Sequence, residues 1–536
     1  MTEDSARGGF FLVSGSTLAT VISAVAAILV GRLMGPDLYG EYNLVITIPA
    51  LVLLFTDLGI STGITKFAAS LHGEGNDARA FSIIRFGVWF RFLIGVLATI
   101  LSVAFAGFLA LVINRPTDLF YVQIASLAIV FQAVYGTVNA AFVGLDRSEY
   151  NALTTNVQAV TKTVLQVSFV LVSISMTGVL IGYVGGFAVA AVAGAFLLFY
   201  KLMKTAKTKV NARTDPPHPH TESRTETLRL LARYGMPLYI STVLMGFIPL
   251  YQKVVLSFFV QNVDIGNYAA STNFVALLAV IPSSITIALL PAFSKLGSFS
   301  TPDVINAFFK RANKYTCLLI VPVSALLLIF SNQVVQIVYG SKYSTAGLFL
   351  AFSVLVYFLA AMGSLSLPSL FNGLGLTRLT LYVGLVNLVT VIALSPILVR
   401  PYGVVGVVLA NLGGGIVSAA YAAYIGINKL KVHFEAGITA KIYLSGVLAS
   451  LIPLLLVYFM SRHYVIAFII GVILYLLIYI TLIPLTGILN DRDLAAIERL
   501  TTRIRGLHTP AKPILWYMRT IITTTNRLKQ KLTHKR

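Results

Sequence analysis

Six charged side chains lie within or beside long apolar segments of the chain, where a charge is costly. Within the segments lie Asp57, Arg91, Lys162 and Lys253, and near segment ends lie Arg85 and Arg32. A charge at such a position usually faces a water-filled cavity or a partner of opposite charge. Because five of the six are cations, they predict an electropositive cavity that binds a phosphate or pyrophosphate group.

Plainer explanations exist for each of these residues. The side chains of Arg85, Arg91 and Arg32 can extend from a segment end to the membrane surface. That explanation suits Lys162 and Lys253 less well, because both lie deeper in their segments. Asp57 either pairs with a neighbouring cation or couples transport to H⁺ or Na⁺. We therefore predict substrate binding by the five cations and an ion-coupling role for the carboxylate.

Catalytic motifs are missing from the sequence. It contains no Walker loop, no His-Glu-x-x-His motif and no Cys/His spacing typical of metal sites. The single cysteine, Cys317, excludes an intrachain disulfide. Gly413-Gly414-Gly415 lies in an apolar segment, where close helix packing explains it better than phosphate binding. We expect no enzyme activity, no cofactor and no metal site.

The composition predicts that these residues belong to a membrane protein. Of the 536 residues, 57% are apolar and 11% are charged, whereas about a quarter of a soluble protein is charged. Apolar runs near the ~20 residues that cross a bilayer recur along the chain. They predict an all-α integral membrane protein with about 14 transmembrane helices. The expected spans are 10–31, 42–64, 84–113, 119–144, 153–175, 178–200, 234–260, 267–292, 312–331, 346–371, 378–399, 403–427, 439–460 and 464–489.

The distribution of basic residues predicts the orientation. The net charge is +21, which in a soluble protein would suggest a nucleic-acid partner. Here, with the N-terminus inside, 32 Lys and Arg residues fall in cytoplasmic segments and 5 in outer loops. Cytoplasmic loops of membrane proteins favour Lys and Arg. We predict a multi-pass cell-membrane protein with both termini cytoplasmic and no nucleic-acid partner.

Two similar halves flank a basic linker at 201–233. Motifs of Gly, Tyr, Arg and Asn recur at offsets of 226, 231 and about 225 residues, which predicts parallel repeats. We expect an N-terminal lobe at 1–200 and a C-terminal lobe at 234–427, each with six spans. Two further spans lie in 428–489, and a basic tail follows at 490–536. The linker pair His218 and His220 is better explained by solvation than by metal binding.

The tail is too polar to cross a membrane. Its apolar residues recur at helical spacing among basic residues, which predicts a cytoplasmic amphipathic helix. Such a helix suits the surface of an anionic lipid leaflet. A helix that binds a protein partner, such as a glycan-assembly enzyme, is the alternative.

Several short motifs carry a family resemblance. The run from Gly31 to Tyr42, GRLMGPDLYGEY, resembles the first-loop signature of the polysaccharide-transporter family. This family belongs to the multidrug/oligosaccharidyl-lipid/polysaccharide flippase superfamily. Asp57-Leu58-Gly59 with Lys66, the stretch 372–378 and the stretch 490–494 resemble further parts of the family pattern.

The resemblance implies both a mechanism and a cargo. Members have two six-helix lobes that give alternating access to a central cavity. Their usual cargo is a saccharide linked to polyprenyl phosphate or pyrophosphate, moved from the cytoplasmic to the outer leaflet. We therefore expect a flippase for a lipid-linked oligosaccharide. The alternatives are a cation-coupled multidrug or toxin exporter of the same superfamily, and a nontransporting scaffold of a glycan-assembly complex.

Overall fold

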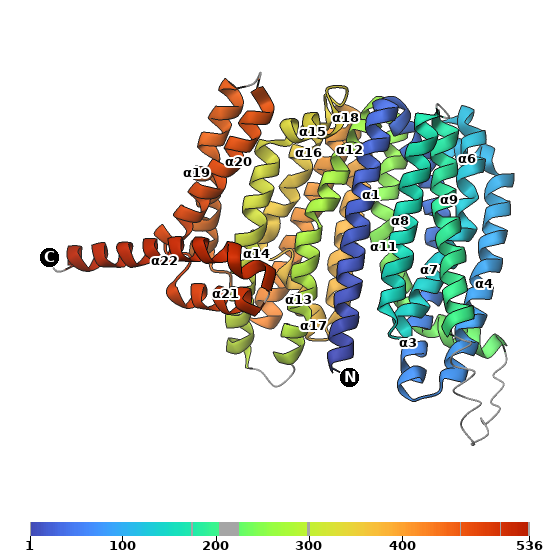
Figure 1. The fold of residues 1–536 in the computed structure, drawn as a ribbon, viewed down its shortest axis with the longest axis horizontal. Coiled ribbons are helices and arrows are strands. Elements are labelled where there is room, and N and C mark those ends of the chain that lie inside the picture. Colours follow the sequence, from blue (N-terminus) through green and yellow to red (C-terminus); the bar gives the residue numbers. More distant parts are fainter. Residues whose placement is uncertain are drawn as a thin grey trace. The chain divides into compact units, whose positions relative to one another are not determined.

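The computed structural model is helical throughout the part of the chain that it describes (Figure 1). It describes residues 2–172, 175–202, 224–296, 301–460, 463–503 and 505–533. Within these ranges there are α-helices with short 3₁₀ and π segments and no strand. The predicted all-α fold class is confirmed. Most of the predicted linker, including His218 and His220, lies outside the described residues.

Large apolar side chains cover the outer faces of the helices. Examples are Leu93, Val192 and Val389, which are 61%, 67% and 64% exposed. Water would make so large an apolar surface unfavourable, whereas lipid chains solvate it. Ten of the described helices are long and apolar enough to cross a membrane, or eleven if one bent pair counts as a span. The chain is a multi-pass membrane protein.

The predicted count of fourteen spans is not confirmed, for reasons visible in three helices. α1 (Thr2–Val45) and α18 (Thr377–Leu430) each run on through a predicted loop, with a break at Gly35 (φ 78°) and at Gly403 (φ 55°). α8 (Ser148–Leu171) is not among the ten, because amide and hydroxyl side chains lower its hydropathy.

The chain forms two compact units, which differ from the predicted lobes in their bounds. The first consists of Met1–Leu277, Val338–Phe349 and Asn387–Gly414. Besides α1 and α8 it holds α2 (Thr47–Thr56), α3 (Ile60–Gly73), α4 (Asp77–Ala104), α5 (Ala106–Val112), η1 (Pro116–Asp118), α6 (Leu119–Ser126), α7 (Ala128–Gly144), α9 (Ser175–Phe196), η2 (Leu197–Leu202), α11 (Arg224–Phe259) and nearly all of α12 (Asn262–Leu278). α8 packs between α1 and α9. The division into lobes remains a prediction.

Within this unit, α1 beyond its break meets α12 in direct backbone contact. A Cβ added to Gly40 would overlap the carbonyl of Asn262, and one added to Gly266 would overlap the carbonyl of Pro36. Arg115 also binds α12 at this contact: its Nε and Nη2 donate hydrogen bonds to Asn262 Oδ1 at 2.9 and 2.6 Å. Glycine at both positions lets the two backbones approach this closely. The segments 37–42 and 264–268, which are one of the matching pairs behind the predicted repeat, are thus neighbours in space.

The second unit consists of Leu278–Ile337, Leu350–Val386 and Gly415–Arg536. It holds α13 (Val280–Leu296), α14 (Pro302–Ile329), η3 (Leu355–Met362), α17 (Ser366–Gly373), α19 (Ala436–Phe459), α20 (Tyr464–Leu485), α21 (Asp491–Arg503) and α22 (Arg505–Thr533). α15 (Ser331–Tyr339) and α16 (Ala346–Val354) cross the boundary between the units, as does α18. Cys317 is buried in the core of this unit with Tyr475 and Tyr479.

Asp493 ties α21 to α14. Its carboxylate accepts hydrogen bonds from Lys314 Nζ at 2.8 Å, Tyr315 Oη at 2.6 Å and the backbone N–H of Asn490 at 3.1 Å. Burial by itself raises the pKa of Asp493, but these hydrogen bonds and the charge of Lys314 together lower the pKa below its ordinary value. The attachment therefore favours the ionised carboxylate.

Asp493→Asn is expected to loosen α21. Amide hydrogen exchange of α21 at neutral pH should rise about tenfold, equivalent to ~1.4 kcal/mol. In the unaltered protein, the stabilisation of α21 by the ionised Asp493 is fully present above the ordinary carboxyl pKa of ~4. It is lost as the pH falls through the lowered pKa of the folded state. Asp491→Asn is the control, because Asp491 is exposed on the same helix. Equal exchange in the two variants would contradict this role of Asp493.

Candidate functional site

A cavity of about 450 Å³ lies in the first unit, lined by α1, α8 and α12. α1 contributes small and hydroxyl side chains at helical spacing, among them Ser16, Thr20, Ser23 and Ala27. This spacing places them on one face of the helix. Because their side chains are short, the space beside α1 stays open, and the hydroxyls make this wall of the cavity polar.

α8 supplies another wall of the cavity. Thr155, Gln158, Lys162 and Gln166 follow one another at intervals of three or four residues and all line the cavity. α9 packs closely behind them: a Cβ at Gly186 would lie 2.6 Å from the Cβ of Lys162. The side of α8 toward α9 is therefore filled by backbone, and the lysine side chain extends to the cavity.

Tyrosine and amide side chains form one end of the cavity. Asn273 Nδ2 donates to Tyr39 Oη at 3.0 Å and to Tyr339 Oη at 2.8 Å. Gln166 Nε2 donates to Tyr42 Oη at 2.9 Å, and the rings of Tyr39 and Tyr42 stack with centroids 6.3 Å apart. Linked hydrogen bonds of this kind hold polar groups in fixed positions at membrane depth.

Among the described residues that line the cavity, Lys162 is the one with a charged side chain. Among the described residues that line the cavity there is no Asp or Glu. No hydrogen bond or ion pair joins Lys162 to another described residue. A lysine without a protein counter-ion, surrounded by amides and hydroxyls, suits an anionic group that carries further oxygen atoms.

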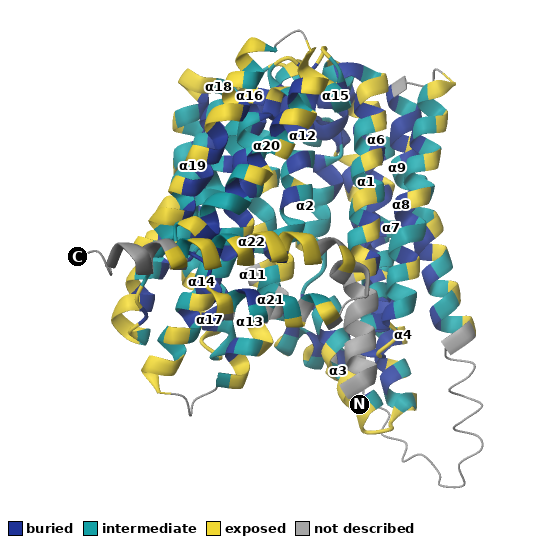
Figure 2. Ribbon diagram, turned by 60° about the vertical axis from the view of Figure 1, so that its left-hand side comes forward, coloured by how far each residue is buried: buried dark blue, intermediate teal, exposed yellow. Residues whose placement is uncertain are grey.

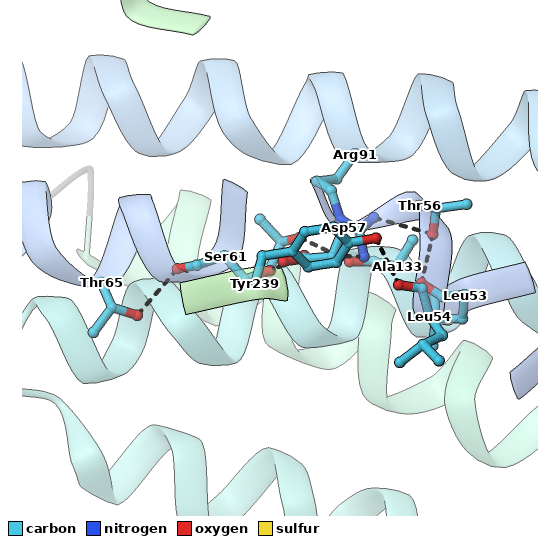
Figure 3. Close-up of polar contacts among 10 residues, drawn as sticks. Leu53, Leu54, Thr56, Asp57, Ser61, Thr65, Arg91, Ala133 and Tyr239 are labelled. Atoms are coloured by element: carbon cyan, nitrogen blue, oxygen red, sulfur yellow. Dashed lines mark hydrogen bonds and ion pairs between the residues drawn. The ribbon is translucent and has the colours of Figure 1, made fainter. Parts of the chain in front are cut away.

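The structure brings Asp57 and Arg91 together at a different place in the first unit (Figure 3). Asp57 Oδ1 lies 3.4 Å from Arg91 Nη2 and accepts a hydrogen bond from Ser61 Oγ at 2.6 Å. Arg91 also donates to Thr56 Oγ1 at 3.2 Å and to Thr137 Oγ1 at 3.3 Å. The Arg91 side chain is 3% exposed and that of Asp57 is 23% exposed.

This ion pair has a structural explanation. Between α2 and α3 the backbone turns through positive φ at Leu58 and Gly59. A Cβ at Gly235 would overlap the carbonyl of Gly59, so α11 packs directly on this turn. The buried guanidinium of Arg91 compensates the carboxylate of Asp57 at the break, as a charge at membrane depth requires.

The remaining predicted residues do not line the cavity. Arg32 and Arg85 are exposed. Lys253 is partly buried on α11 beside Gln252, whose amide exchanges two hydrogen bonds with that of Asn411. The structure therefore brings Lys162 into the cavity and pairs Arg91 with Asp57. The substrate-binding and ion-coupling roles remain predictions.

Several lining residues were missed from the sequence. Gln158 and Gln166 could have been found, because they lie four residues before and after Lys162 and share its helix face. Asn273 gave no such signal. Its hydrogen bonds to Tyr39 and Tyr339 depend on the packing of three distant parts of the chain.

Solved transporters share this fold. The lipid II flippase MurJ in an inward closed conformation has 15% sequence identity and a TM-score of 0.67, over 88% of this chain and 98% of that chain. An inward-facing multidrug resistance MATE family transporter of the MOP superfamily has 16% identity and a TM-score of 0.56, over 77% and 94%. A MOP superfamily transporter from Pyrococcus furiosus, described with a binding pocket of reverse polarity, has 15% identity and a TM-score of 0.51, over 80% and 96%.

These likenesses show that the chain has the fold of these transporters. Its sequence identifies the family: the profile described as "Polysaccharide biosynthesis protein" matches residues 5–297, more than half of the chain. The chain belongs to that family, and the predicted resemblance is confirmed. No sequence match is found among curated proteins.

Proposed function

We propose that this protein is a flippase that moves a polyprenyl-phosphate- or pyrophosphate-linked oligosaccharide from the cytoplasmic to the outer leaflet. The observation that carries the proposal is Lys162 in a cavity of amides and hydroxyls. The lysine attracts the phosphate of the carrier, and the neutral polar groups hydrogen-bond the sugar. The family membership and the fold shared with a lipid II flippase support the same cargo.

The alternative functions fit less well. An exporter of cationic drugs needs a carboxylate in its cavity, and the described lining residues include none. Asp57 is paired with Arg91 and is not among those residues. A nontransporting scaffold would need no cavity with an unpaired lysine.

A flipping assay with purified protein tests the proposal. Proteoliposomes carry a fluorescent polyprenyl-pyrophosphate disaccharide, and a membrane-impermeant reducing agent reports how much lies in the outer leaflet. We expect protein-dependent flipping of this lipid and no efflux of a cationic dye. Dye efflux without lipid flipping would favour the exporter, and neither activity would favour the scaffold.

The membrane potential is expected to drive the cargo more than a proton gradient does. An inside-negative potential assists outward movement of a negative headgroup by ~2.3 kcal/mol per charge per 100 mV, about fiftyfold per charge. The same liposomes, clamped at zero or negative potential, measure this effect. Transport that ignores the potential but stops in Asp57→Asn would instead favour ion antiport.

We also propose that both termini and the 201–233 linker are cytoplasmic. The excess of Lys and Arg in the segments on that side supports this orientation. After Cys317→Ala, a cysteine placed at position 215 should resist an impermeant thiol reagent in intact cells and react after lysis. Labelling in intact cells would contradict the orientation.

A further inference from the structure

α22 lies across the membrane-spanning helices of the second unit (Figure 1). Leu515, Met518 and Ile522 on one face are at most 9% exposed and pack into the core cluster that contains Tyr479 and Ile483 of α20. This packing fixes the helix to the protein along one side. The opposite side contains many exposed residues (Figure 2).

The depth of α22 is set by a contact with α20. Tyr517 Oη lies 2.9 Å from Thr481 Oγ1, which belongs to the last two turns of α20. α20 is one of the helices able to cross the membrane and ends at Leu485. A helix that runs across the spans at the level where one of them ends lies at the membrane surface.

One side of α22 combines a tryptophan with basic residues. Lys512, Trp516 and Arg519 are spaced by four and three residues, and Arg527 follows three turns after Trp516, so all four share one side of the helix. We call these four residues the basic stripe. Trp516 is 69% exposed, and the other three side chains are also exposed. Tryptophan is favoured where lipid headgroups meet acyl chains.

The positive charge of α22 indicates which kind of membrane surface it would bind. Its sequence contains six Lys and Arg residues and no Asp or Glu. Arg519 pairs with Glu498 of α21 at 2.8 Å, whereas Lys512 and Arg527 have no ion pair within the described chain. An apolar and basic side at the end of a span fits a layer of negatively charged headgroups.

We propose that the basic stripe of α22 docks on the anionic leaflet of the membrane, with Trp516 inserted below the headgroups and Lys512 and Arg527 in contact with lipid phosphates. The docking holds α21 and α22 in the membrane plane at the ends of the spans. It does not depend on which substrate is transported.

The fluorescence of Trp516 can report the docking directly. The chain has two tryptophans, Trp89 and Trp516, so replacing Trp89 leaves Trp516 as the one fluorescent tryptophan. The Trp89→Phe protein is placed in vesicles of neutral phosphatidylcholine, with or without one-third anionic phosphatidylglycerol. With the anionic lipid, we expect brominated lipids to quench Trp516 fluorescence. Bromine near the headgroup end of the acyl chain should quench about twofold more than bromine near the methyl end. Aqueous acrylamide should quench it weakly.

The lipid charge and the two free basic residues are tested together. In anionic vesicles, acrylamide should quench Trp516 of Lys512→Gln/Arg527→Gln about twofold more strongly than Trp516 of the parent. The quenching of this variant should match that of the parent in neutral vesicles. Lys342→Gln/Arg400→Gln makes the same charge change elsewhere and should leave the quenching unaltered. Trp516→Phe keeps Trp89, 58% exposed on the spanning helix α4, as a reference for folding and lipid contact.

Two results would overturn the proposal. Strong acrylamide quenching of Trp516 without bromolipid quenching would show that the helix stands in water and leaves its stripe for a protein partner. Quenching that is the same in neutral and anionic vesicles, and unchanged by Lys512→Gln/Arg527→Gln, would show that lipid charge plays no part.

Discussion

Lys162→Glu is expected to abolish flipping of the pyrophosphate-linked disaccharide while leaving the yield of folded protein unchanged. The substitution replaces the cation of the cavity lining by a carboxylate and so turns attraction for the phosphate into repulsion. Lys162→Gln removes the charge alone and should lower the initial rate about tenfold or more, because the loss of one charge-assisted hydrogen bond costs ~1.5–3 kcal/mol. The proteoliposome assay measures both.

The control for this prediction is Lys342→Glu, an exposed lysine of the same unit that does not line the cavity. It should flip the lipid at the unaltered rate. Lys253→Glu tests separately whether the partly buried Lys253 contacts the cargo during transport. Full activity of Lys162→Glu/Lys253→Glu would refute a role for either lysine in binding the phosphate.

Gly40→Val and Gly266→Val are each expected to destabilise the first unit. Each new side chain would meet the backbone of the partner helix, which cannot rotate away as a side chain can. Forcing α1 and α12 apart should cost about 3 kcal/mol or more, a factor of about 150 in the equilibrium between packed and separated helices. Size-exclusion chromatography after graded heating in detergent measures the remaining folded monomer, and flipping should fall with it.

Gly136→Val separates this effect from the general effect of valine in a helix. Gly136 lies within α7, and an added Cβ there would meet no atom within 4 Å. The folded fraction of the Gly136→Val protein after heating should match that of the unaltered protein. If Gly40→Val and Gly266→Val are as heat-resistant as Gly136→Val, the close approach of α1 and α12 does not occur.

The fold class followed from the sequence because it depends on local composition. Apolar runs of bilayer length predict helices wherever they occur, and the described segments are helical accordingly. The number of spans did not follow as easily. At Gly35 and Gly403 a single residue interrupts the helix without a polar loop. At α8 the polar residues needed for the cavity lower the signal on which the count depends.

Only part of the candidate site was predicted, because some of its residues stand out in the local sequence and others do not. Lys162 was identified because a charge in an apolar segment is conspicuous in any sequence. Pairing of Asp57 with a cation was one of the open alternatives. Its partner, Arg91, lies on another helix, and the two meet beside the turn at Leu58 and Gly59. Asn273 has an unremarkable position in its segment and acquires its place only when the helices pack.

The break at Gly403 bears on how the ribosome and translocon must handle this protein. A Cβ at Gly406 would overlap the carbonyl of Leu398, so the chain doubles back within α18 over very few residues. Arg400 lies in the short connection between the two arms. The two arms should therefore be inserted during synthesis as one helical hairpin.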